Sequence, residues 1–252
     1  MRLLKPKTCK HVTSVAGMVA AVLFSSLEST AQPRGFVSVN GGFQASSSDF
    51  IENLTFVSNG EDASATTTNA VDGGIMFDVG GGAFVAEHLA IGAGLSRYDR
   101  DSDAAVSASL PNPFFFNHNR LVDGVQAAGR TETVAHVQLQ WFIPVNDQLE
   151  VGVFGGPSFF SVDQEFVRGV DFTDAFPFDT ATFVSAPTEP QSASAVGFHL
   201  GADVTLFLTP NVGVGGLVRF SRATVDFATA DGGTQSLDAG GVQAGGGLRL
   251  RF

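Results

Sequence analysis

Lysine and cysteine are nearly absent from this chain. Of its 252 residues only Cys9 is a cysteine, and the three lysines, Lys5, Lys7 and Lys10, all lie close to the N-terminus. The rest of the chain therefore has no thiol for a disulfide or a thiolate metal site. It also lacks the clustered basic residues that nucleic-acid binding requires, so no nucleic-acid partner is expected.

Long hydrophobic runs are lacking as well. No segment approaches the roughly 20 apolar residues that a transmembrane helix needs. The apolar run Val12–Phe24 follows a basic stretch and precedes the small residues Ser29-Thr30-Ala31. This order is typical of a secretory signal peptide and predicts removal of residues 1–31, leaving residues 32–252 as the mature domain. Cys9 precedes the apolar run, so it is not the lipidated cysteine of a lipoprotein. An amphipathic first helix of a cytosolic domain is the alternative.

Acidic residues dominate what remains. Removing Arg2, the three lysines and Glu28 from 14 basic and 25 acidic residues leaves 10 arginines against 24 acids, a net charge of −14. The chain also holds 30 glycines and 24 phenylalanines. Glycine weakens ordinary strands, whereas a small, tightly curved barrel with a crowded interior favours residues without bulk.

A period of two runs through the last segment. From Val242 to Phe252 every second residue is apolar or small, and the residues between include Gln243, Arg249 and Arg251. Such alternation predicts a strand with two different faces. The same pattern recurs, so that eight strands are predicted: Gly35–Gln44, Val71–Val85, Leu89–Leu110, Leu121–Ile143, Leu149–Val162, Ala193–Leu208, Val212–Phe227 and Ser236–Phe252.

Two local features interrupt the alternation. Asn59-Gly60, in the segment between the first two strands, is a strong type I′ hairpin signal. In the third strand the apolar residues change phase across Asp99–Asp103, which predicts a β-bulge or a break there.

The connections alternate between short and long. Those after the second, fourth and sixth strands are a few residues each, whereas those after the first, third and fifth are long. Together with an even strand number, this asymmetry predicts an all-β, eight-stranded, antiparallel up-and-down transmembrane β-barrel rather than a β-sandwich. Aromatic girdles are expected at both membrane interfaces. Their predicted members are Trp141, Phe207 and Phe252 at the short-turn end, and Tyr98, Phe159, Phe160 and Phe220 at the other end.

The leader, the alternating strands and the terminal pattern Leu248-x-Leu250-x-Phe252 resemble the small outer-membrane β-barrel superfamily of the OmpA, OmpX and OmpW type. The resemblance rests on the pattern of the mature chain, not on a diagnostic motif. It implies that Leu248, Leu250 and Phe252 are read as an assembly signal by the barrel-assembly machinery. Periplasmic chaperones, outer-membrane lipids and lipopolysaccharide are then further partners, and the outer membrane of a Gram-negative-type cell is the location.

Six charged residues are predicted to face the inside of this barrel: Asp78, Glu150, Asp203, Arg219, Arg249 and Arg251. Charges in a low-dielectric interior must be paired or solvated. An eight-stranded barrel leaves room for little more than its own side chains, so a plug of ion pairs is the expected arrangement. A narrow, porin-like pore for small solutes is the alternative.

Catalytic and metal-binding patterns are weak. Ser158, His199 and Glu132 share inward parity, but a catalytic set requires mutual hydrogen bonds that parity does not establish. A lipid-modifying enzyme is therefore the third alternative, and no catalytic residue is assigned. Asp99–Asp103 lacks the glycine and glutamate of a calcium loop, which leaves only loose divalent binding. The glycine clusters Gly80–Gly82 and Gly213–Gly216 precede no helix and match no nucleotide-binding motif. No cofactor and no metal are expected.

The loop Pro111–Arg120 carries Phe114, Phe115 and Phe116 at its tip. Exposed apolar tips often mark contact with a partner or a membrane. The alternative is that these rings fold back over the barrel mouth. The sequence thus favours a structural or surface-interaction role through extracellular loops and their partner.

Overall fold

The computed structural model describes residues 34–45, 49–70, 73–229 and 233–252. The predicted leader, residues 1–31, and the predicted strand start at Val71 lie outside the described residues. Twelve strands and no helix are present in the described part. Among the same residues, no helix is long and apolar enough to cross a membrane.

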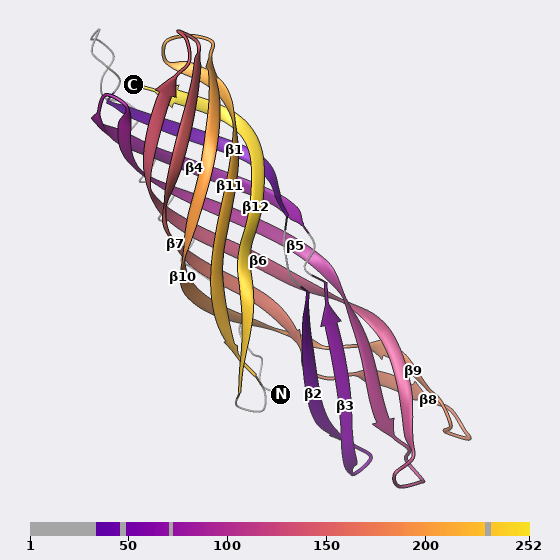
Figure 1. The fold of residues 1–252 in the computed structure, drawn as a ribbon. Helices are drawn as coiled ribbons and strands as arrows, with labels where there is room; N and C mark the ends of the chain where they lie inside the picture. The colour runs from indigo at the N-terminus through magenta and orange to yellow at the C-terminus, as the bar shows by residue number, and fades with distance from the viewer. Residues whose placement is uncertain (1–33, 46–48, 71–72, 230–232) are drawn as a thin grey trace, which may run out of the picture.

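Eight of the strands form a closed antiparallel ring (Figure 1). They are β1 (Gly35–Ala45), β4 (Gly74–Ala86), β5 (Leu89–Pro111), β6 (Asn119–Pro144), β7 (Leu149–Val167), β10 (Thr188–Phe207), β11 (Val212–Ala228) and β12 (Thr234–Arg251). Each pairs with its neighbours in chain order, and the pairing of β1 with β12 closes the ring. The all-β, antiparallel barrel predicted from the sequence is confirmed, and the ring strands correspond to the eight predicted strands. Closure leaves the ring without a free sheet edge.

The long connections contain the other four strands. β2 (Phe50–Ser58) and β3 (Glu61–Asn69) form a hairpin between β1 and β4, and β8 (Asp171–Asp174) pairs with β9 (Ala181–Ser185) between β7 and β10. Asn59 and Gly60, between β2 and β3, both have positive φ, 53° and 81°, as the predicted type I′ turn requires. Most of this structure was predicted as loop.

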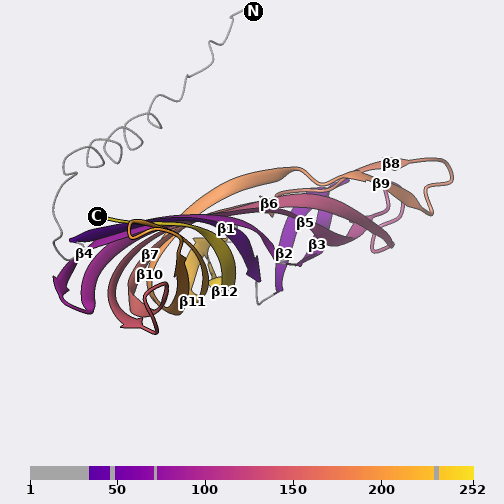
Figure 2. The ribbon, with the colours of Figure 1, turned by 90° about the horizontal axis from the view of Figure 1, so that it is seen from above.

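These hairpins and the outer halves of β5 and β6 build an extension that projects beyond the ring (Figure 2). We define the extension as residues 50–69, 104–127 and 167–187. β3 pairs with the outer half of β5, from Ser64↔Ser109 to Asn69↔Ala104. The extension has its own apolar core, which consists of Leu54, Ala63, Ala65, Val106, Ala108, Leu110, Val122, Val167, Val170 and Ala186. It is therefore a packed unit and not a set of separate loops.

The predicted bulge at Asp99–Asp103 is wrong. β5 and β6 pair without a register shift from Leu89↔Trp141 to Pro111↔Asn119. Alternate residues of β5 stay on the inside along the strand, from Ala90 and Tyr98 to Val106 and Leu110. What changes is the face that is apolar. In the half of β5 that belongs to the ring, apolar residues such as Ile91 and Leu95 lie outside, and in the half that belongs to the extension, Val106 and Leu110 lie inside. The phase of the apolar pattern therefore reports a change in surroundings and not a backbone irregularity.

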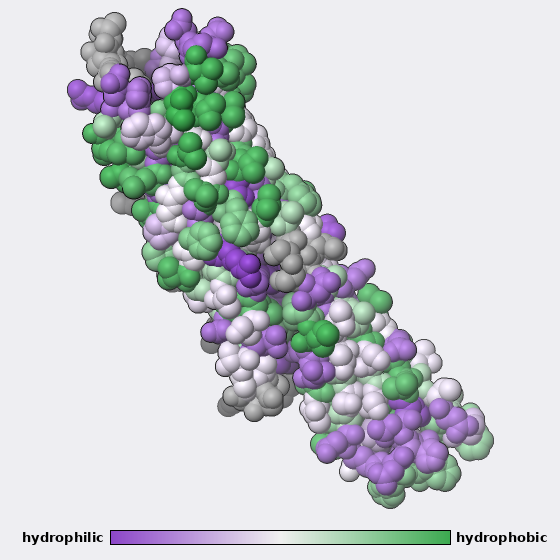
Figure 3. Space-filling model, viewed as in Figure 1, coloured by the Kyte–Doolittle hydropathy of each residue, from purple (hydrophilic) through white to green (hydrophobic). Residues whose placement is uncertain are grey.

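The same reversal occurs on β11. Val214, Val218 and Phe220 are exposed on the outside of the ring, whereas beyond them Val225 and Phe227 are buried on the inside. Figure 3 shows the result on one side of the molecule: apolar surface gathers over the ring, and polar surface dominates the extension.

Aromatic residues lie at the margins of the apolar surface, with corrections to the predicted girdles. Trp141, Phe159, Phe220 and Phe252 are exposed on the outside. Tyr98 and Phe160 are instead buried within the ring, and Phe207 lines an internal cavity. All three have inward parity on their strands, so the strand alternation overrides their preference for an interface.

Candidate functional site

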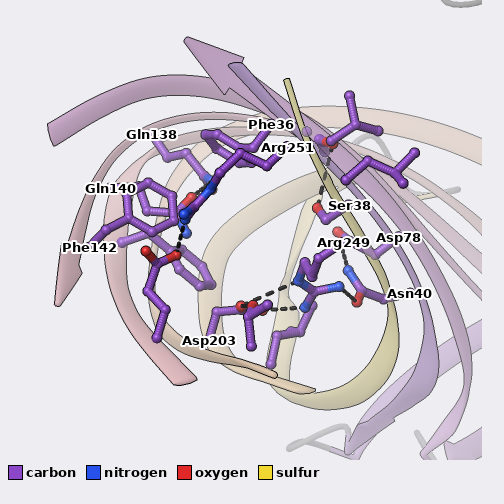
Figure 4. Close-up of a pocket in the computed structure, with 18 of the residues that line it drawn as sticks. Phe36, Ser38, Asn40, Asp78, Gln138, Gln140, Phe142, Asp203, Arg249 and Arg251 are labelled. Carbon is purple, nitrogen blue, oxygen red and sulfur yellow. Dashed lines mark hydrogen bonds and ion pairs between the residues drawn. The ribbon is translucent and has the colours of Figure 1, made fainter. Parts of the chain in front are cut away.

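The inside of the ring holds the six predicted charges, and each acid forms an ion pair with one arginine. Figure 4 shows Asp78, Asp203, Arg249 and Arg251 pointing into the lumen. Arg219 Nη2 lies 2.9 Å from Asp78 Oδ2. Arg249 pairs with Asp203, and Arg251 pairs with Glu150. The partners of each pair come from strands that are not neighbours in the ring, so all three pairs cross the lumen. The pair of Arg219 and Asp78 joins β11 to β4 across the seam at which β1 pairs with β12.

Neutral side chains join these pairs into one network. Asn40 donates to Asp78 Oδ1 at 2.9 Å and accepts from Arg249 Nη1 at 2.5 Å. Thr205 donates to Asp203 at 2.8 Å, and Arg219 Nε donates to Gln243 at 2.6 Å. Asn40, Asp78, Arg219 and Gln243 are almost completely buried. Pairing and hydrogen bonds of this kind offset the cost of burying charge.

Aromatic rings close the short-turn end of the lumen. Phe36, Phe84 and Phe142 pack against one another with ring centroids 5.0–6.0 Å apart. The guanidinium of Arg251 lies 4.5 Å from the Phe207 ring centroid and is held by Glu150. A cavity of about 50 Å³ remains between these rings and the network, which is room for water and not for a solute.

An apolar layer closes the opposite end. It consists of Phe50, Val134, Phe160, Val162, Phe166, Ala223, Val225, Phe227, Leu237 and Ala239. Its residues come from β2 and from the ring strands β6, β7, β11 and β12. The polar network is therefore enclosed between two apolar closures.

A second group of polar side chains lies inside the ring and consists of Ser96, His136, Ser158 and His199. Ser158 Oγ is 2.8 Å from His199 Nδ1 and 2.9 Å from His136 Nδ1, and His136 Nε2 is 3.0 Å from Ser96 Oγ. Ser158 is fully buried. The structure thus brings Ser158 and His199 together, as their shared parity suggested.

Glu132 does not join them. Its carboxylate accepts from Arg130 Nε at 2.8 Å, from the Gly240 backbone N–H at 3.0 Å and from Gln44 Nε2 at 3.1 Å. It therefore cannot orient either histidine. The contributions of Arg130 and His136 were missed from the sequence, although both have even parity on the strand that also carries Glu132.

The far end of the extension, which we call the tip, presents phenylalanines to solvent. The exposed fractions of Phe114, Phe115 and Phe116 are 69%, 61% and 78%, and that of Phe176, between β8 and β9, is 87%. Phe178 links the two loops, with its ring centroid 5.1 Å from that of Phe114 and 6.1 Å from that of Phe176. The rings of Phe114–Phe116 do not fold back over the barrel mouth.

Polar contacts hold the tip in place. Arg120, buried beneath it, lies 2.6 Å from Asp174 Oδ1 and donates to the Pro111 carbonyl at 3.0 Å. Asn112 donates to the Phe178 carbonyl at 3.0 Å and accepts from the Phe114 N–H at 2.9 Å. The exposed rings are thus mounted on a fixed support. The sequence placed Arg120 in the loop but gave no indication of its role.

The β2–β3 hairpin is tied to the same support. Asn59 donates to the Pro111 carbonyl at 3.2 Å, and Glu61 accepts from the Asn117 N–H at 3.3 Å. At the base of the extension, Arg168 Nη1 lies 3.8 Å from Glu52 Oε1. Burial raises the pKa of Glu52, and Arg168 partly offsets this effect.

Leu248, Leu250 and Phe252 lie together on the outside of the ring, each 38% exposed or more. Their segment pairs with both β1 and β11. Phe252 donates to the Gly35 carbonyl at 3.0 Å and accepts from the Gly35 N–H at 2.8 Å. The residues that the resemblance assigns to assembly therefore form part of the seam that closes the ring.

The aspartates at 99–103 form no metal centre. Asp99 pairs with Arg97 at 3.3 Å and accepts from Thr131 at 3.1 Å. In the part of the chain that the structure describes, no three histidine, cysteine, aspartate or glutamate side chains are grouped so that they could hold a metal ion.

No protein-family model matches this chain, and no curated protein matches its sequence. Several solved structures are similar. The N-terminal β-barrel domain of Pseudomonas aeruginosa OprF has 10% identity and a TM-score of 0.35, with 87% of this chain and 98% of that chain covered. The attachment invasion locus protein Ail of Yersinia pestis has 9% identity and a TM-score of 0.35, with coverage of 86% and 99%. The outer membrane protease OmpT from Escherichia coli has 7% identity and a TM-score of 0.45, with coverage of 90% and 99%. These likenesses concern the fold alone.

Proposed function

We propose that this protein is an integral outer-membrane β-barrel that interacts with a partner through the tip of its extension. The reversal of polarity along the ring strands carries the proposal. Over the middle of the ring the outside exposes Val, Leu, Ile and Phe and the inside holds the polar network, whereas towards the extension the outside is polar and the inside is apolar. Only a change of solvent from hydrocarbon to water makes both arrangements favourable on one continuous strand.

The dimensions of the exposed apolar zone agree with this proposal. On β10 outward residues from Val196 to Leu206 are exposed and apolar. A tilted strand needs about 9–11 residues to cross a bilayer. Short turns join β4 to β5, β6 to β7 and β10 to β11 at one end, and the extension leaves the other end. In outer-membrane barrels short turns are periplasmic and long segments extracellular, so the extension would face the exterior.

Heat-modifiable gel mobility tests the barrel. Protein extracted from membranes is expected to migrate differently before and after boiling, because the closed ring resists detergent denaturation until it is heated. A chain that remains soluble after removal of its leader and shows no mobility shift would contradict the proposal.

A narrow pore is the alternative, and both closures of the lumen speak against it. In planar bilayers the protein is expected to show no steady openings. Replacing Phe36 and Phe142 by alanine opens only the short-turn end, so this variant is also expected to remain silent because the apolar layer persists. Regular conductance steps from the wild-type protein would favour the pore.

The proposal assigns no catalytic role. Ser158 lies between two imidazoles inside the ring, and Glu132 is held elsewhere. A serine in this position has no access to lipid on the outside of the ring.

Outer-membrane lipids and lipopolysaccharide are the proposed surroundings of the apolar zone, and the barrel-assembly machinery and periplasmic chaperones are the proposed partners during assembly.

A further inference from the structure

The tip combines apolar exposure with negative charge. The extension contains seven acids, Glu52, Glu61, Asp62, Asp123, Asp171, Asp174 and Asp179. Its basic residues are Arg120, which is buried and paired with Asp174, and Arg168, which lies at the base near Glu52 and Glu189. Around the four exposed phenylalanines, the charge that reaches solvent is therefore negative.

Because the loops that carry the exposed phenylalanines are already held in place, they lose little conformational freedom when a partner binds. Arg120 and Asn112 fix both aromatic loops to each other, and Asn59 and Glu61 fix the β2–β3 hairpin beside them. Aromatic side chains on a rigid support bind with a small loss of conformational entropy. Exposed aromatic clusters of this kind are typical centres of protein interfaces.

We infer that the tip docks on a partner protein whose surface has an apolar groove surrounded by lysine or arginine. The inference rests on the proposed function, because that orientation places the tip outside the membrane. Charge complementarity selects the partner. The tip of a second copy carries the same negative charge and would be repelled, and anionic lipid surfaces would repel it as well.

Peptide binding tests the chemistry of the partner. The full barrel is placed in zwitterionic nanodiscs, because free detergent would cover the phenylalanines, and empty nanodiscs supply the background. Three peptides of equal length serve as probes: one with leucine, tryptophan and arginine, one with glutamate in place of arginine, and one with serine in place of the apolar residues. Only the first is expected to bind, and its binding is expected to weaken as ionic strength rises.

Substitutions at the tip and elsewhere test whether the first peptide binds at the tip. Phe114→Ser with Phe176→Ser is expected to weaken binding of the first peptide by about tenfold or more. The matched control is Val125→Ser with Val184→Ser, two residues exposed elsewhere on the extension, and it is expected to bind as the wild type does. Asp62→Asn with Asp179→Asn is expected to reduce the salt dependence, whereas Asp147→Asn with Asp226→Asn, away from the tip, leaves it unchanged.

Three outcomes overturn the inference. One is equal binding of all three peptides, and another is binding of the first peptide that Phe114→Ser with Phe176→Ser leaves unchanged. The third is wild-type flotation with phosphatidylcholine or phosphatidylglycerol vesicles that the phenylalanine variant loses. The last would assign the tip to lipid instead. Each variant is first checked for heat-modifiable mobility, so a failure of the barrel itself is seen separately from a failure of the tip to bind.

Discussion

Replacing Arg219 by alanine is expected to lower the free energy of unfolding by about 3–5 kcal/mol, because removal of one partner leaves a buried charge uncompensated. Asp78 would retain only the hydrogen bond from Asn40, and Gln243 would lose the donor at its Oε1 atom. Unfolding by urea in lipid micelles measures the loss. Trp141 is the single tryptophan and lies half-exposed on the outer apolar surface, so its fluorescence reports when that surface enters water.

Two matched variants show whether the loss of stability comes from an unpaired buried charge or from the loss of any ion pair. Asp78→Asn with Arg219→Met removes both charges and is expected to recover much of the stability, since no uncompensated charge remains. Arg97→Ala breaks an ion pair whose side chains are 61% and 63% exposed, and exposed pairs contribute about 0–1 kcal/mol. Equal losses for Arg219→Ala and Arg97→Ala would contradict the buried network.

Replacing Gly247 by alanine is expected to destabilise the closed ring by about 1–3 kcal/mol, the usual range for overpacking. A Cβ atom at Gly247 would overlap the backbone carbonyl oxygen of Val39 in the adjacent strand. Backbone atoms of a paired strand cannot rotate away as a side chain can, so β1 and β12 would have to separate locally. The fraction of protein with the heat-modifiable, closed mobility after refolding measures this effect.

Gly41 provides the control in the same pair of strands. It lies opposite Gly246, and a Cβ atom there would meet no atom within 4 Å. Gly41→Ala is therefore expected to change stability by about 0.5 kcal/mol or less. If both alanine variants refold equally well, β1 and β12 do not approach as closely at Gly247 as the structure has them.

Both predictions concern the same physical requirement. The interior of an eight-stranded ring has room for little besides its own side chains, so the inward charges must pair with one another when the strands close. The seam between β1 and β12 brings Arg219 of β11 to Asp78 of β4. The curved wall from β7 to β12 brings Arg249 and Arg251 to acids on β10 and β7. A lumen filled in this way stabilises the ring, and the proposed contact with a partner is assigned to the extension.

The strand alternation determined much of this protein without any tertiary information. The period of two identified the ring strands and the side of each strand on which Asp78, Arg219 and Arg249 lie. Side-chain direction follows from the pleat alone, so parity is a local property. The difference between short and long connections likewise indicated which end of the ring carries the additional structure.

Only the tertiary structure decided which residues meet. Parity gives the side of a strand but not the height, which depends on register and strand tilt around the closed ring. Glu132 therefore meets Arg130 and Gln44 while Ser158 meets two histidines, although all have inward parity. The outward continuation of the third and fourth strands through Ala104–Leu110 and Leu121–Val125 was predicted, whereas the β2–β3 and β8–β9 hairpins were missed. The core that they share with β5 and β6 forms only when three connections pack together. At the apparent break, Asp99–Asp103, the strand continues without a bulge and the apolar residues change from its outer to its inner face.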